Sequence, residues 1–511
     1  MVARIKTLAF QGISAVEIDV QVHLSPGKMI FTTVGLPDKA VAESRERVRS
    51  ALAAIGLGLP PERITVNLAP ADLPKEGSHY DLPIALGLMQ AMGALTPEML
   101  DGYVAIGELA LDGRIGGVPG VLPAAMAAMS WDCGLICPAV CGSEAAWSGL
   151  TKTDKGVIAA DNLLQVINHL RGTEIIPQPE PGYEKSVEGL PDLSDIRGQE
   201  QARLALEVAA AGGHNLLMTG PPGAGKSMLA ARLPAILPRL EPQERLEISM
   251  INSLAAGTGN GAMAQERPFR SPHHSASMAA LIGGGRQAKP GEISMAHHGV
   301  LFLDELPEFT RQSLDALRQP IETGEVQIAR ADAHVTYPAR FQLIAAMNPC
   351  RCGHPNDPEL SCHRLPHCMQ EYLSRLSGPL LDRFDIRIEV PPVALRDMIA
   401  PRSGEPSCDV AKRVASARQI QLDRNKERLN IQLDGDELLA MAKPGVKGQK
   451  LLDRIADRSG LTARGFNRIM RVSRTLADLD EAPAPTENHV ASALMWRGFP
   501  RASEAKARSS N

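Results

Sequence analysis

Strand-like runs and helix-like repeats of apolar residues alternate along the first third of the chain. Apolar residues three and four positions apart are typical of amphipathic helices, and short β-rich runs are typical of strands. The predicted strands cover 16–23, 29–34 and 103–109, and the predicted helices cover 43–55 and 82–92. Residues 177–191 contain four prolines and two glycines without apolar periodicity, which is linker composition. We therefore place a first domain at 1–172 and a linker at 173–191.

The pattern changes twice after the linker. From residue 192 to 393, strands, glycine-rich turns and helices follow one another, which predicts an α/β module. From 394 to 500 the apolar spacing is helical throughout, and 501–511 has the composition of a disordered tail. The predicted C-terminal helices are 409–430, 436–441, 448–458, 463–479 and 487–496.

Composition and charge narrow the protein class. The 511 residues are 44% hydrophobic and 22% charged, which excludes wholesale disorder and a fibrous protein. No apolar stretch is long enough to span a bilayer, and no apolar segment follows Met1 as in a secretory signal, so we expect a cytoplasmic protein. From residue 396 onward, 21 Lys and Arg stand against 15 Asp and Glu, although the whole chain has a net charge of −4. This basic C-terminal part is either a polyanion-binding surface or a solvated helical face.

The clearest chemical motif is a glycine-rich loop between a strand and a helix. An apolar strand at 215–219 leads into it, and a helix-like segment at 228–237 follows. In this context glycines let backbone N–H groups surround phosphate oxygens, Lys226 reaches the β- and γ-phosphates, and Ser227 ligates Mg²⁺. The predicted nucleotide-binding residues of the loop are Gly220, Pro221, Pro222, Gly223, Ala224, Gly225, Lys226 and Ser227.

Two further apolar strands end in polar side chains that suit ATP hydrolysis. The strand beginning at Gly299 ends in Asp304, which can hold Mg²⁺, and Glu305, which can take a proton from the attacking water. The strand at 341–347 ends in Asn348, whose amide can orient that water. Arg383 follows later; it is either a transition-state arginine or the partner of an ion pair with Asp382 or Asp385.

These motifs are similar to those of a known family. The phosphate loop, 300–305, Asn348, 380–385 and 461–465 resemble the AAA+ ATPases of the magnesium-chelatase branch. The segments Val34 to Val48, Phe269 to His274 and Pro290 to Ser294 resemble the ComM/YifB proteins.

The resemblance implies roles that the residues alone do not reveal. Asn348 corresponds to sensor 1, Arg383 to the arginine finger and Arg464 to the sensor-2 arginine, and Ile196 lies in the segment that holds the adenine ring. The family implies ATP and Mg²⁺ as cofactors and a ring-shaped homo-hexamer. It also implies a DNA helicase that promotes branch migration in natural transformation and homologous recombination.

The N-terminal region resembles the Lon-protease-like α+β fold, which is related to ribosomal protein S5 domain 2. Lon enzymes use a Ser nucleophile with a distant Lys. Here the comparable stretch contains Ser78, but the best register places His79 at the nucleophile position, and 113–129 contains no Lys. An activated Ser needs a base within hydrogen-bond reach, so we predict a domain without peptidase activity.

Four cysteines lie between Asn348 and Arg383 with the spacing C-x-C-x9-C-x5-C. They are Cys350, Cys352, Cys362 and Cys368. Four thiolates can hold Zn²⁺ and fix a loop over 350–368, but Arg364 occupies the position where relatives carry a fourth Cys. The alternatives are therefore a zinc site, with Cys368, His363 or His367 as the fourth ligand, and reduced cysteines. We expect the second group, Cys133, Cys137 and Cys141, to pack in the core.

A ring-shaped helicase needs basic residues that face the pore of the ring. A hairpin predicted over 325–341 places Arg330 near its tip, and a glycine-rich insertion contains Arg286 and Lys289. Lys and Arg contacts to phosphates bind DNA without sequence preference, although each of these cations is also compatible with ordinary solvation. Arg464, Arg468 and Arg471 are expected on one face of a helix. Arg468 and Arg471 either bind a polyanion or lie at an interface. The alternative function is a protein-remodelling or chelatase-type AAA+ ATPase that acts on a partner protein.

Overall fold

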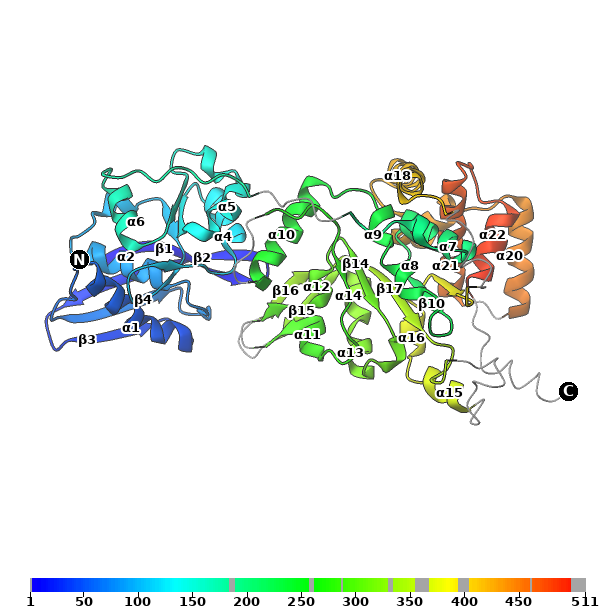
Figure 1. Cartoon of the computed structure of the whole chain (residues 1–511), viewed down its shortest axis with the longest axis horizontal. Coiled ribbons are helices and arrows are strands. Elements are labelled where there is room, and N and C mark those ends of the chain that lie inside the picture. Colours follow the sequence, from blue (N-terminus) through cyan, green and yellow to red (C-terminus); the bar gives the residue numbers. More distant parts are fainter. Residues whose placement is uncertain are drawn as a thin grey trace.

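The computed structural model describes residues 2–182, 189–256, 262–285, 288–329, 334–353, 367–393, 404–459 and 462–497. Three regions follow one another along an elongated molecule: an N-terminal sheet with helices, a central α/β core and a C-terminal helical group (Figure 1). The mixed α/β architecture expected from the sequence is confirmed. Among the described residues, no helix combines the length and the apolar character that crossing a bilayer requires.

The N-terminal region is built on a seven-stranded mixed sheet with the strand order β3-β4-β2-β1-β5-β8-β9. Its strands are β1 (Val2–Gln11), β2 (Ser14–Ser25), β3 (Ile30–Val34), β4 (Arg63–Ala69), β5 (Tyr103–Ala105), β8 (Gly134–Pro138) and β9 (Val157–Ala160). The strand expected over 103–109 is divided into β5 and β6 (Glu108–Leu109), and β6 pairs with β7 (Ile115–Gly116) outside the main sheet. Leu82 N–H donates to the Gly107 carbonyl at this break.

The helices of this region cover the sheet. They are α1 (Lys39–Ala54), α2 (Asp81–Ala91), α3 (Pro97–Leu100), α4 (Val121–Ser130), α5 (Gly142–Ala145) and α6 (Leu163–Leu170). Helix α1 begins after Asp38, whose side chain accepts the Val41 N–H as an N-cap. Helix α2 is buried along nearly its whole length because it packs on β1 and β2. Cys133, Cys137 and Cys141 are buried beside α4, as expected for core cysteines.

The central core contains a five-stranded parallel sheet with the order β11-β14-β17-β10-β18. Its strands are β10 (Leu216–Thr219), β11 (Phe269–Arg270), β14 (Val300–Leu303), β17 (Gln342–Met347) and β18 (Ile386–Glu389). Every residue of β10, β14 and β17 is buried. Such continuous apolar runs are typical of parallel strands covered on both faces.

Helices and hairpins surround this sheet. The helices are α7 (Glu200–Gly212), α8 (Lys226–Ala230), α9 (Leu233–Ile236), α10 (Pro242–Ala256), α11 (Met278–Ile282), α12 (Glu292–Met295), α13 (Arg311–Ala316), α14 (Arg318–Thr323), α15 (His367–Leu373) and α16 (Gly378–Leu381). The single helix expected over 228–237 is wrong: it is divided into α8 and α9, and Pro234 stands in the first turn of α9. The hairpins are β12 (Gly283–Gly284) with β13 (Lys289–Pro290), and β15 (Glu325–Ala329) with β16 (His334–Pro338).

Within the described part of the C-terminal region, five helices form a group at the far end from the N-terminal sheet (Figure 1). They are α18 (Ser407–Arg424), α19 (Gly435–Met441), α20 (Val446–Ser459), α21 (Ala463–Leu479) and α22 (Glu487–Met495). Helix α21 lies at the centre of the group, where it contacts α18, α19, α22 and α7 of the core. All five helices expected from the apolar spacing are present, and the largest difference is that α18 ends six residues early.

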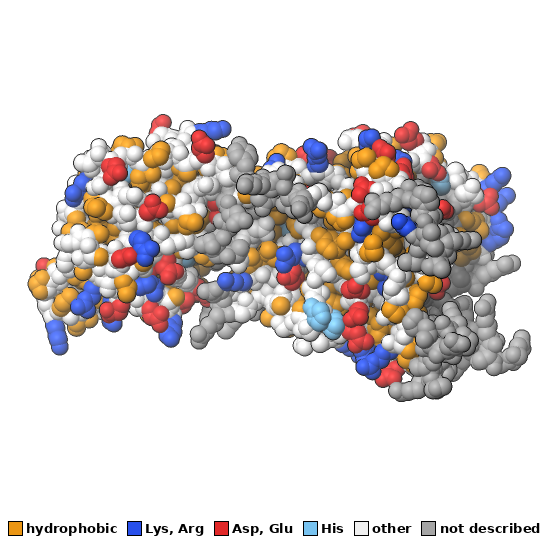
Figure 2. Space-filling view, in the orientation of Figure 1, with side chains coloured by type: hydrophobic (Ala, Val, Ile, Leu, Met, Phe, Trp, Pro, Cys, Tyr) orange, Lys and Arg blue, Asp and Glu red, His pale blue; other side chains and the backbone are white. Residues whose placement is uncertain are grey.

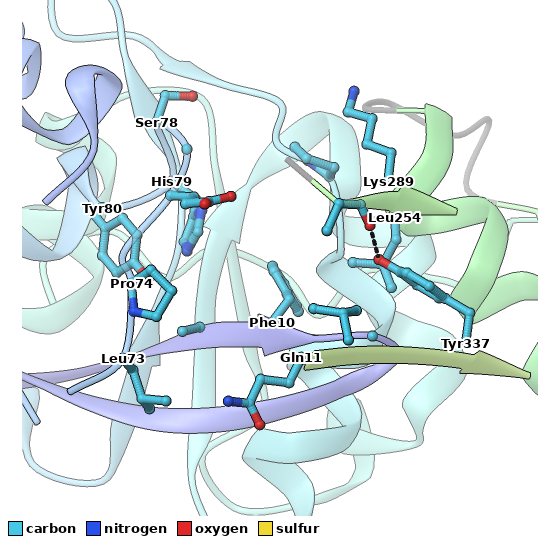
Figure 3. A pocket seen from close by; sticks show the side chains of 17 residues that line it. Phe10, Gln11, Leu73, Pro74, Ser78, His79, Tyr80, Leu254, Lys289 and Tyr337 are labelled. Carbon is cyan, nitrogen blue, oxygen red and sulfur yellow. Dashed lines mark hydrogen bonds between the residues drawn. The ribbon is translucent and has the colours of Figure 1, made fainter. Parts of the chain in front are cut away.

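Helix α10 joins the N-terminal region to the core (Figure 1). It packs on α4, and the Gly120 N–H donates to the Ser253 carbonyl at 3.1 Å. Beside this contact, the turn between β1 and β2 reaches β16, where a Cβ on Gly12 would stand 2.1 Å from the Thr336 carbonyl oxygen. A hollow of 290 Å³ remains between the two regions, lined by Phe10, His79 and Tyr80 on one side and Lys289 and Tyr337 on the other (Figure 3).

Candidate nucleotide-binding and catalytic site

Three loops meet at one edge of the core sheet because of the strand order. β14, β17 and β10 are neighbours and parallel, so the loops that follow them leave from the same edge. Asp304 and Glu305 follow β14, Asn348 follows β17, and the glycine-rich loop follows β10. Sheet topology alone thus brings together Lys226 and Asp304, about 80 positions apart in the sequence, and Asp304 and Asn348, about 40 positions apart.

The glycine-rich loop surrounds an open space. Gly223 and Gly225 have φ values of +77° and +87°, and a Cβ on either would meet no atom within 4 Å. Lys226 begins α8 and is only 7% exposed; its Nζ donates to the carbonyls of Gly220 at 2.7 Å and Pro221 at 2.9 Å. Burial lowers the pKa of Lys226, whereas Asp304 and Glu305 act in the opposite direction. The loop therefore holds the Lys226 cation against its own backbone carbonyls, beside the open space where a phosphate can bind.

A hydroxyl and a carboxylate are already paired at the position expected for Mg²⁺. Ser227 Oγ donates to Asp304 Oδ2 at 2.6 Å. Both groups are hard oxygen ligands of the kind Mg²⁺ prefers, so the donor set fits that ion. Lys226 Nζ also donates to Asn348 Oδ1 at 3.1 Å, which brings the third loop into the same cluster.

Glu305 has an unusual backbone conformation. Its φ is +51°, in the left-handed region that few non-glycine residues adopt, and its N–H donates to Asp304 Oδ1 at 2.9 Å. The side chain is 53% exposed, and its Oε2 lies 3.3 Å from Nδ1 of His274. Such strained residues persist only where the surroundings fix them, and they concentrate at functional sites. Sequence reasoning assigned no role to His274.

The Ile196 segment lies between the core and the C-terminal helices. Ile196 is buried immediately after a short 3-10 turn, and the preceding Leu193 N–H donates to Ser407 Oγ at 2.7 Å at the start of α18. Gln199 Nε2 donates to the Pro391 carbonyl at 2.5 Å and to the Ala224 carbonyl of the phosphate loop at 3.4 Å. The segment is therefore adjacent to the phosphate loop.

Arg383 pairs with an acid that the sequence did not indicate. Its guanidinium donates to Glu322 and, at 2.7 Å, to the Pro379 carbonyl. The expected alternatives, Asp382 and Asp385, are wrong as ion-pair partners: Asp382 binds Arg468, and Asp385 accepts the Asn215 N–H. Glu322 lies in the last turn of α14, 61 residues from Arg383 in sequence, so no local pattern could have revealed the pair.

The three arginines of α21 have different surroundings. Arg464 is exposed in the first turn. Arg468 is buried and donates to Asp382 at 3.0 Å and to the Phe384 carbonyl at 3.0 Å. Arg471 donates to the Leu433 carbonyl at 2.8 Å. Arg468 and Arg471 thus make contacts within the chain, and their role as polyanion or interface residues stays a prediction.

The cysteine loop is only partly described. Sγ of buried Cys350 lies 2.9 Å from Sγ of Cys352. Cys362, His363 and Arg364 lie outside the described residues, and Cys368 is in α15. Among the described residues, Cys350, Cys352 and Cys368 do not form a three-ligand group. The sulfurs of Cys350 and Cys352 are close enough to share one ion.

Of the three candidate DNA-contacting cations, the structure describes one. Lys289 is exposed on β13 at the rim of the interdomain hollow (Figure 3). Arg286 and Arg330 lie outside the described residues. On the face shown in Figure 2, basic, acidic and apolar side chains are mixed over the described residues.

In the N-terminal region, Ser78 is tied to an acid. Its hydroxyl donates to Glu108, and His79 is buried with Nε2 3.0 Å from the Leu8 carbonyl. Burial lowers the pKa of His79 to about 4. The nearest lysine in the sequence, Lys75, is buried and donates to the Pro70 carbonyl. The absence of peptidase activity remains a prediction.

One polar cluster escaped the sequence analysis. Glu247 of α10 lies against the adjacent His297 and His298, with Oε2 at 3.0 Å and 2.7 Å from their Nε2 atoms. The cluster resembles a metal site, but His297 Nδ1 accepts the Arg340 N–H at 3.0 Å, so its Nε2 carries the proton and donates to Glu247. The cluster is therefore a hydrogen-bonded link between α10 and the start of β14.

Three family descriptions match this chain. "Magnesium chelatase, subunit ChlI" matches residues 192–398, "Subunit ChlI of Mg-chelatase" matches 20–140, and "Magnesium chelatase, subunit ChlI C-terminal" matches 404–497.

Several relatives share much of the sequence. The protein YifB of Escherichia coli is 45% identical over 500 residues, which cover 97% of each chain. The competence protein ComM of Haemophilus influenzae is 45% identical over 500 residues, or 96% of this chain and 97% of that relative. The magnesium-chelatase 38 kDa subunit of Rhodobacter capsulatus is 26% identical over 238 residues, or 43% of this chain and 59% of that relative.

Proposed function

Because the chain belongs to the magnesium-chelatase-like family of AAA+ ATPases that includes ComM and YifB, we propose that it is an ATP-driven DNA motor. Its specific task is helicase action that promotes branch migration during homologous recombination or natural transformation. The observation that carries the ATPase part is that Lys226 donates a hydrogen bond to Asn348 and the adjacent Ser227 donates one to Asp304. The name of the competence protein supports the DNA part.

The residues of this chain divide the work of ATP hydrolysis. Loop N–H groups and Lys226 bind the β- and γ-phosphates, and Ser227 and Asp304 hold Mg²⁺, which when bound offsets phosphate charge. Glu305 takes the proton from the attacking water, and Asn348 orients that water. Lys226 gives up its contacts to the Gly220 and Pro221 carbonyls when it turns to phosphate.

The active form that we propose is a homo-hexameric ring. Arg383 lies outside the cluster around Lys226 and is paired with Glu322 in the single chain. A role as arginine finger therefore places it on the nucleotide of a neighbouring subunit, where it neutralises transition-state charge, with Arg464 completing the site from α21. Sedimentation with and without ATP tests this assembly: a monomer in both conditions contradicts it.

DNA contacts in this proposal come from the β12–β13 insertion and the hairpin that follows α14. Lys289 projects from the insertion, and Arg286 and Arg330, which lie outside the described residues, follow β12 and β15 in the sequence. Contacts from such cations to phosphates are sequence-independent and salt-sensitive, which suits a motor that moves along any sequence.

The test measures ATP hydrolysis with no DNA, with single-stranded DNA and with forked DNA, together with strand displacement. We expect stimulation by DNA, loss of strand displacement in Lys226→Ala, and weaker DNA stimulation in Lys289→Ala. The matched control is Lys152→Ala, which removes an exposed lysine of the N-terminal region. ATP hydrolysis that is indifferent to DNA contradicts the motor and favours a chelatase-type ATPase that acts on a protein partner.

We also propose that the cysteine loop binds Zn²⁺ through Cys350 and Cys352, together with ligands from 362–368. The closeness of the two sulfurs supports this proposal, and the ion would clamp a loop that adjoins Asn348. Elemental analysis of purified protein should find about one zinc per chain, and less in Cys352→Ser. A wild-type content far below one contradicts the proposal.

A further inference from the structure

The hollow between the N-terminal region and the core is lined like a ligand-binding site. Its volume of 290 Å³ is close to the lower limit of about 300 Å³ for small-molecule pockets, so it suits a ligand with one ring system. Aromatic side chains stand on both sides of it: Phe10, His79 and Tyr80 from the N-terminal region and Tyr337 from the core (Figure 3). The Phe10 ring is closely packed from behind, because a Cβ on Gly120 would stand 2.4 Å from its Cζ. These walls favour a planar ring that packs against aromatic surfaces.

Two polar atoms on the N-terminal side of the hollow are left without a partner among the described residues. Tyr80 is completely buried, and its hydroxyl forms no hydrogen bond there. His79 is 5% exposed, and its Nε2 donates to the Leu8 carbonyl at 3.0 Å, so its Nδ1 keeps a lone pair. A buried hydroxyl without a partner is costly. A ligand that accepts from the Tyr80 hydroxyl and donates to His79 Nδ1 would remove this cost.

A cation stands at the rim of the same hollow. Lys289 is exposed on β13, and within the described part of the chain no carboxylate forms an ion pair with it. The acid that lines the hollow, Glu76, belongs to the opposite side. An anionic group on the ligand therefore faces Lys289. A nucleotide combines the three features that the hollow asks for, because it has a planar base, donors and acceptors on the base edge, and a phosphate.

The hollow also borders both elements to which we assign DNA contacts. Ala288 and Lys289 lie at β13, and Val335 and Tyr337 belong to β16. The Tyr337 hydroxyl donates to the Ala288 carbonyl at 2.9 Å, which joins the two elements beside the hollow (Figure 3). A single strand that contacts these elements therefore runs past the opening of the hollow.

We propose that the hollow binds one nucleotide, with its base against Phe10 and Tyr80 and its phosphate at Lys289. A DNA strand and a free nucleoside monophosphate share this chemistry. The choice of the strand rests on the proposed function, whereas the fit of base and phosphate rests on the residues that line the hollow. Bound in this way, one base connects the strand to the N-terminal region.

The experiment compares Tyr80→Phe with the matched control Tyr103→Phe in the full-length protein. Tyr103 lies in β5 of the same region, and its hydroxyl donates to the Lys155 carbonyl at 3.3 Å, away from the hollow. A saturating non-hydrolysable ATP analogue fills the phosphate loop. Fluorescence anisotropy then measures the Kd of labelled oligodeoxycytidine, whose bases carry an amine donor, and of an abasic strand of the same length. Thermal unfolding measures Tm with and without millimolar deoxycytidine monophosphate.

We expect Tyr80→Phe to raise the Kd of oligodeoxycytidine about three- to tenfold, which corresponds to one hydrogen bond, and to leave the Kd of the abasic strand unchanged. Its Tm without ligand should not fall, because Phe removes a hydroxyl that has no partner. A purely structural role of Tyr80 would not produce this combination. Lys289→Ala should weaken both strands, because it removes a phosphate contact. Tyr103→Phe should bind both strands like the wild type.

Deoxycytidine monophosphate distinguishes the two sources of the nucleotide. It should raise the Tm of the wild type more than that of Tyr80→Phe. If this difference appears while the strand Kd does not depend on Tyr80, the hollow binds a free nucleotide and the strand is overturned as its source. If neither the strand Kd nor the Tm shift depends on Tyr80, or if Tyr80→Phe weakens both strands equally, the site is overturned. Failure of every strand to bind contradicts the DNA motor, while the monophosphate still decides whether the hollow binds a nucleotide.

Discussion

Replacement of Glu305 by Gln isolates the chemical step from nucleotide binding. The side chain is 53% exposed, so the isosteric amide should change the free energy of unfolding by no more than about 0.5 kcal/mol. The loop, Lys226, Ser227 and Asp304 remain, and the Glu305 N–H can still donate to Asp304. Affinity for ATP should therefore stay within about threefold of the wild type, or 0.7 kcal/mol.

Turnover should respond far more strongly. Loss of a positioned general base costs about 10²- to 10⁴-fold in rate, or roughly 2.7–5.4 kcal/mol in the barrier. A coupled phosphate-release assay measures kcat, and the binding of a fluorescent ATP analogue measures affinity on the same preparation. A Glu305→Gln protein that keeps more than a tenth of wild-type kcat would refute the assignment of Glu305 as the base. Equal losses of affinity and rate would show instead that the change disturbs the phosphate loop.

Three further changes test other parts of the account. Arg383→Ala should retain ATP binding but lose about 10³-fold or more in kcat; a wild-type rate in this variant would exclude a finger role. Gly12→Val should loosen the contact between the N-terminal region and the core and speed protease cleavage of the linker, because its Cβ would collide with the Thr336 carbonyl. Gly149→Val, equally left-handed at φ +81° but in open space, is the control that should cleave at the wild-type rate. Burial lowers the pKa of His79 from 6.5 in the unfolded chain to about 4, so below pH 6.5 the unfolded state binds more protons and the free energy of unfolding decreases as the pH is lowered, by about 1.4 kcal/mol at pH 5.5. His79→Gln should therefore flatten the decline in Tm between pH 6.5 and 5, and an unaltered slope would contradict this.

The local sequence pattern was sufficient to predict helices whose apolar residues recur with one clear helical spacing. Helix α21 begins and ends where the apolar spacing predicts, and Thr462 caps it through the Gly465 N–H. The strands that lead into the phosphate loop and the acidic pair could also be predicted from the sequence, because a short continuous apolar run that ends in glycine or acids is typical of a buried parallel strand. The division of 228–237 was missed because helical periodicity was given more weight than Pro234.

Long-range pairs were beyond sequence reasoning. The pairing of Arg383 with Glu322, and of Glu247 with His297 and His298, joins residues about 50 to 60 positions apart through the arrangement of whole elements. The His274–Glu305 contact depends on how the loop after β11 folds back on the loop after β14. The adjacent His273 and His274 were visible in the sequence, but the distance of His274 from Glu305 was not.

The connection between the N-terminal region and the core was equally hidden. Gly12 looks like any turn glycine, and its function as a close-approach point appears only when β16 is placed beside it. Helix α10 was not anticipated as a separate element, although it contacts α4 on one side and the Glu247 cluster links it to β14 on the other. The energetic value of such contacts depends on geometry that composition does not encode.

The rate of ATP hydrolysis as a function of forked-DNA concentration, at low and high salt, tests the central claim most directly. We expect turnover to rise with DNA and saturate, the half-saturating concentration to increase steeply with salt because phosphate contacts dominate, and all turnover to vanish in Lys226→Ala. A rate that is the same with and without DNA at both salt concentrations would contradict the claim that this ATPase drives movement along DNA.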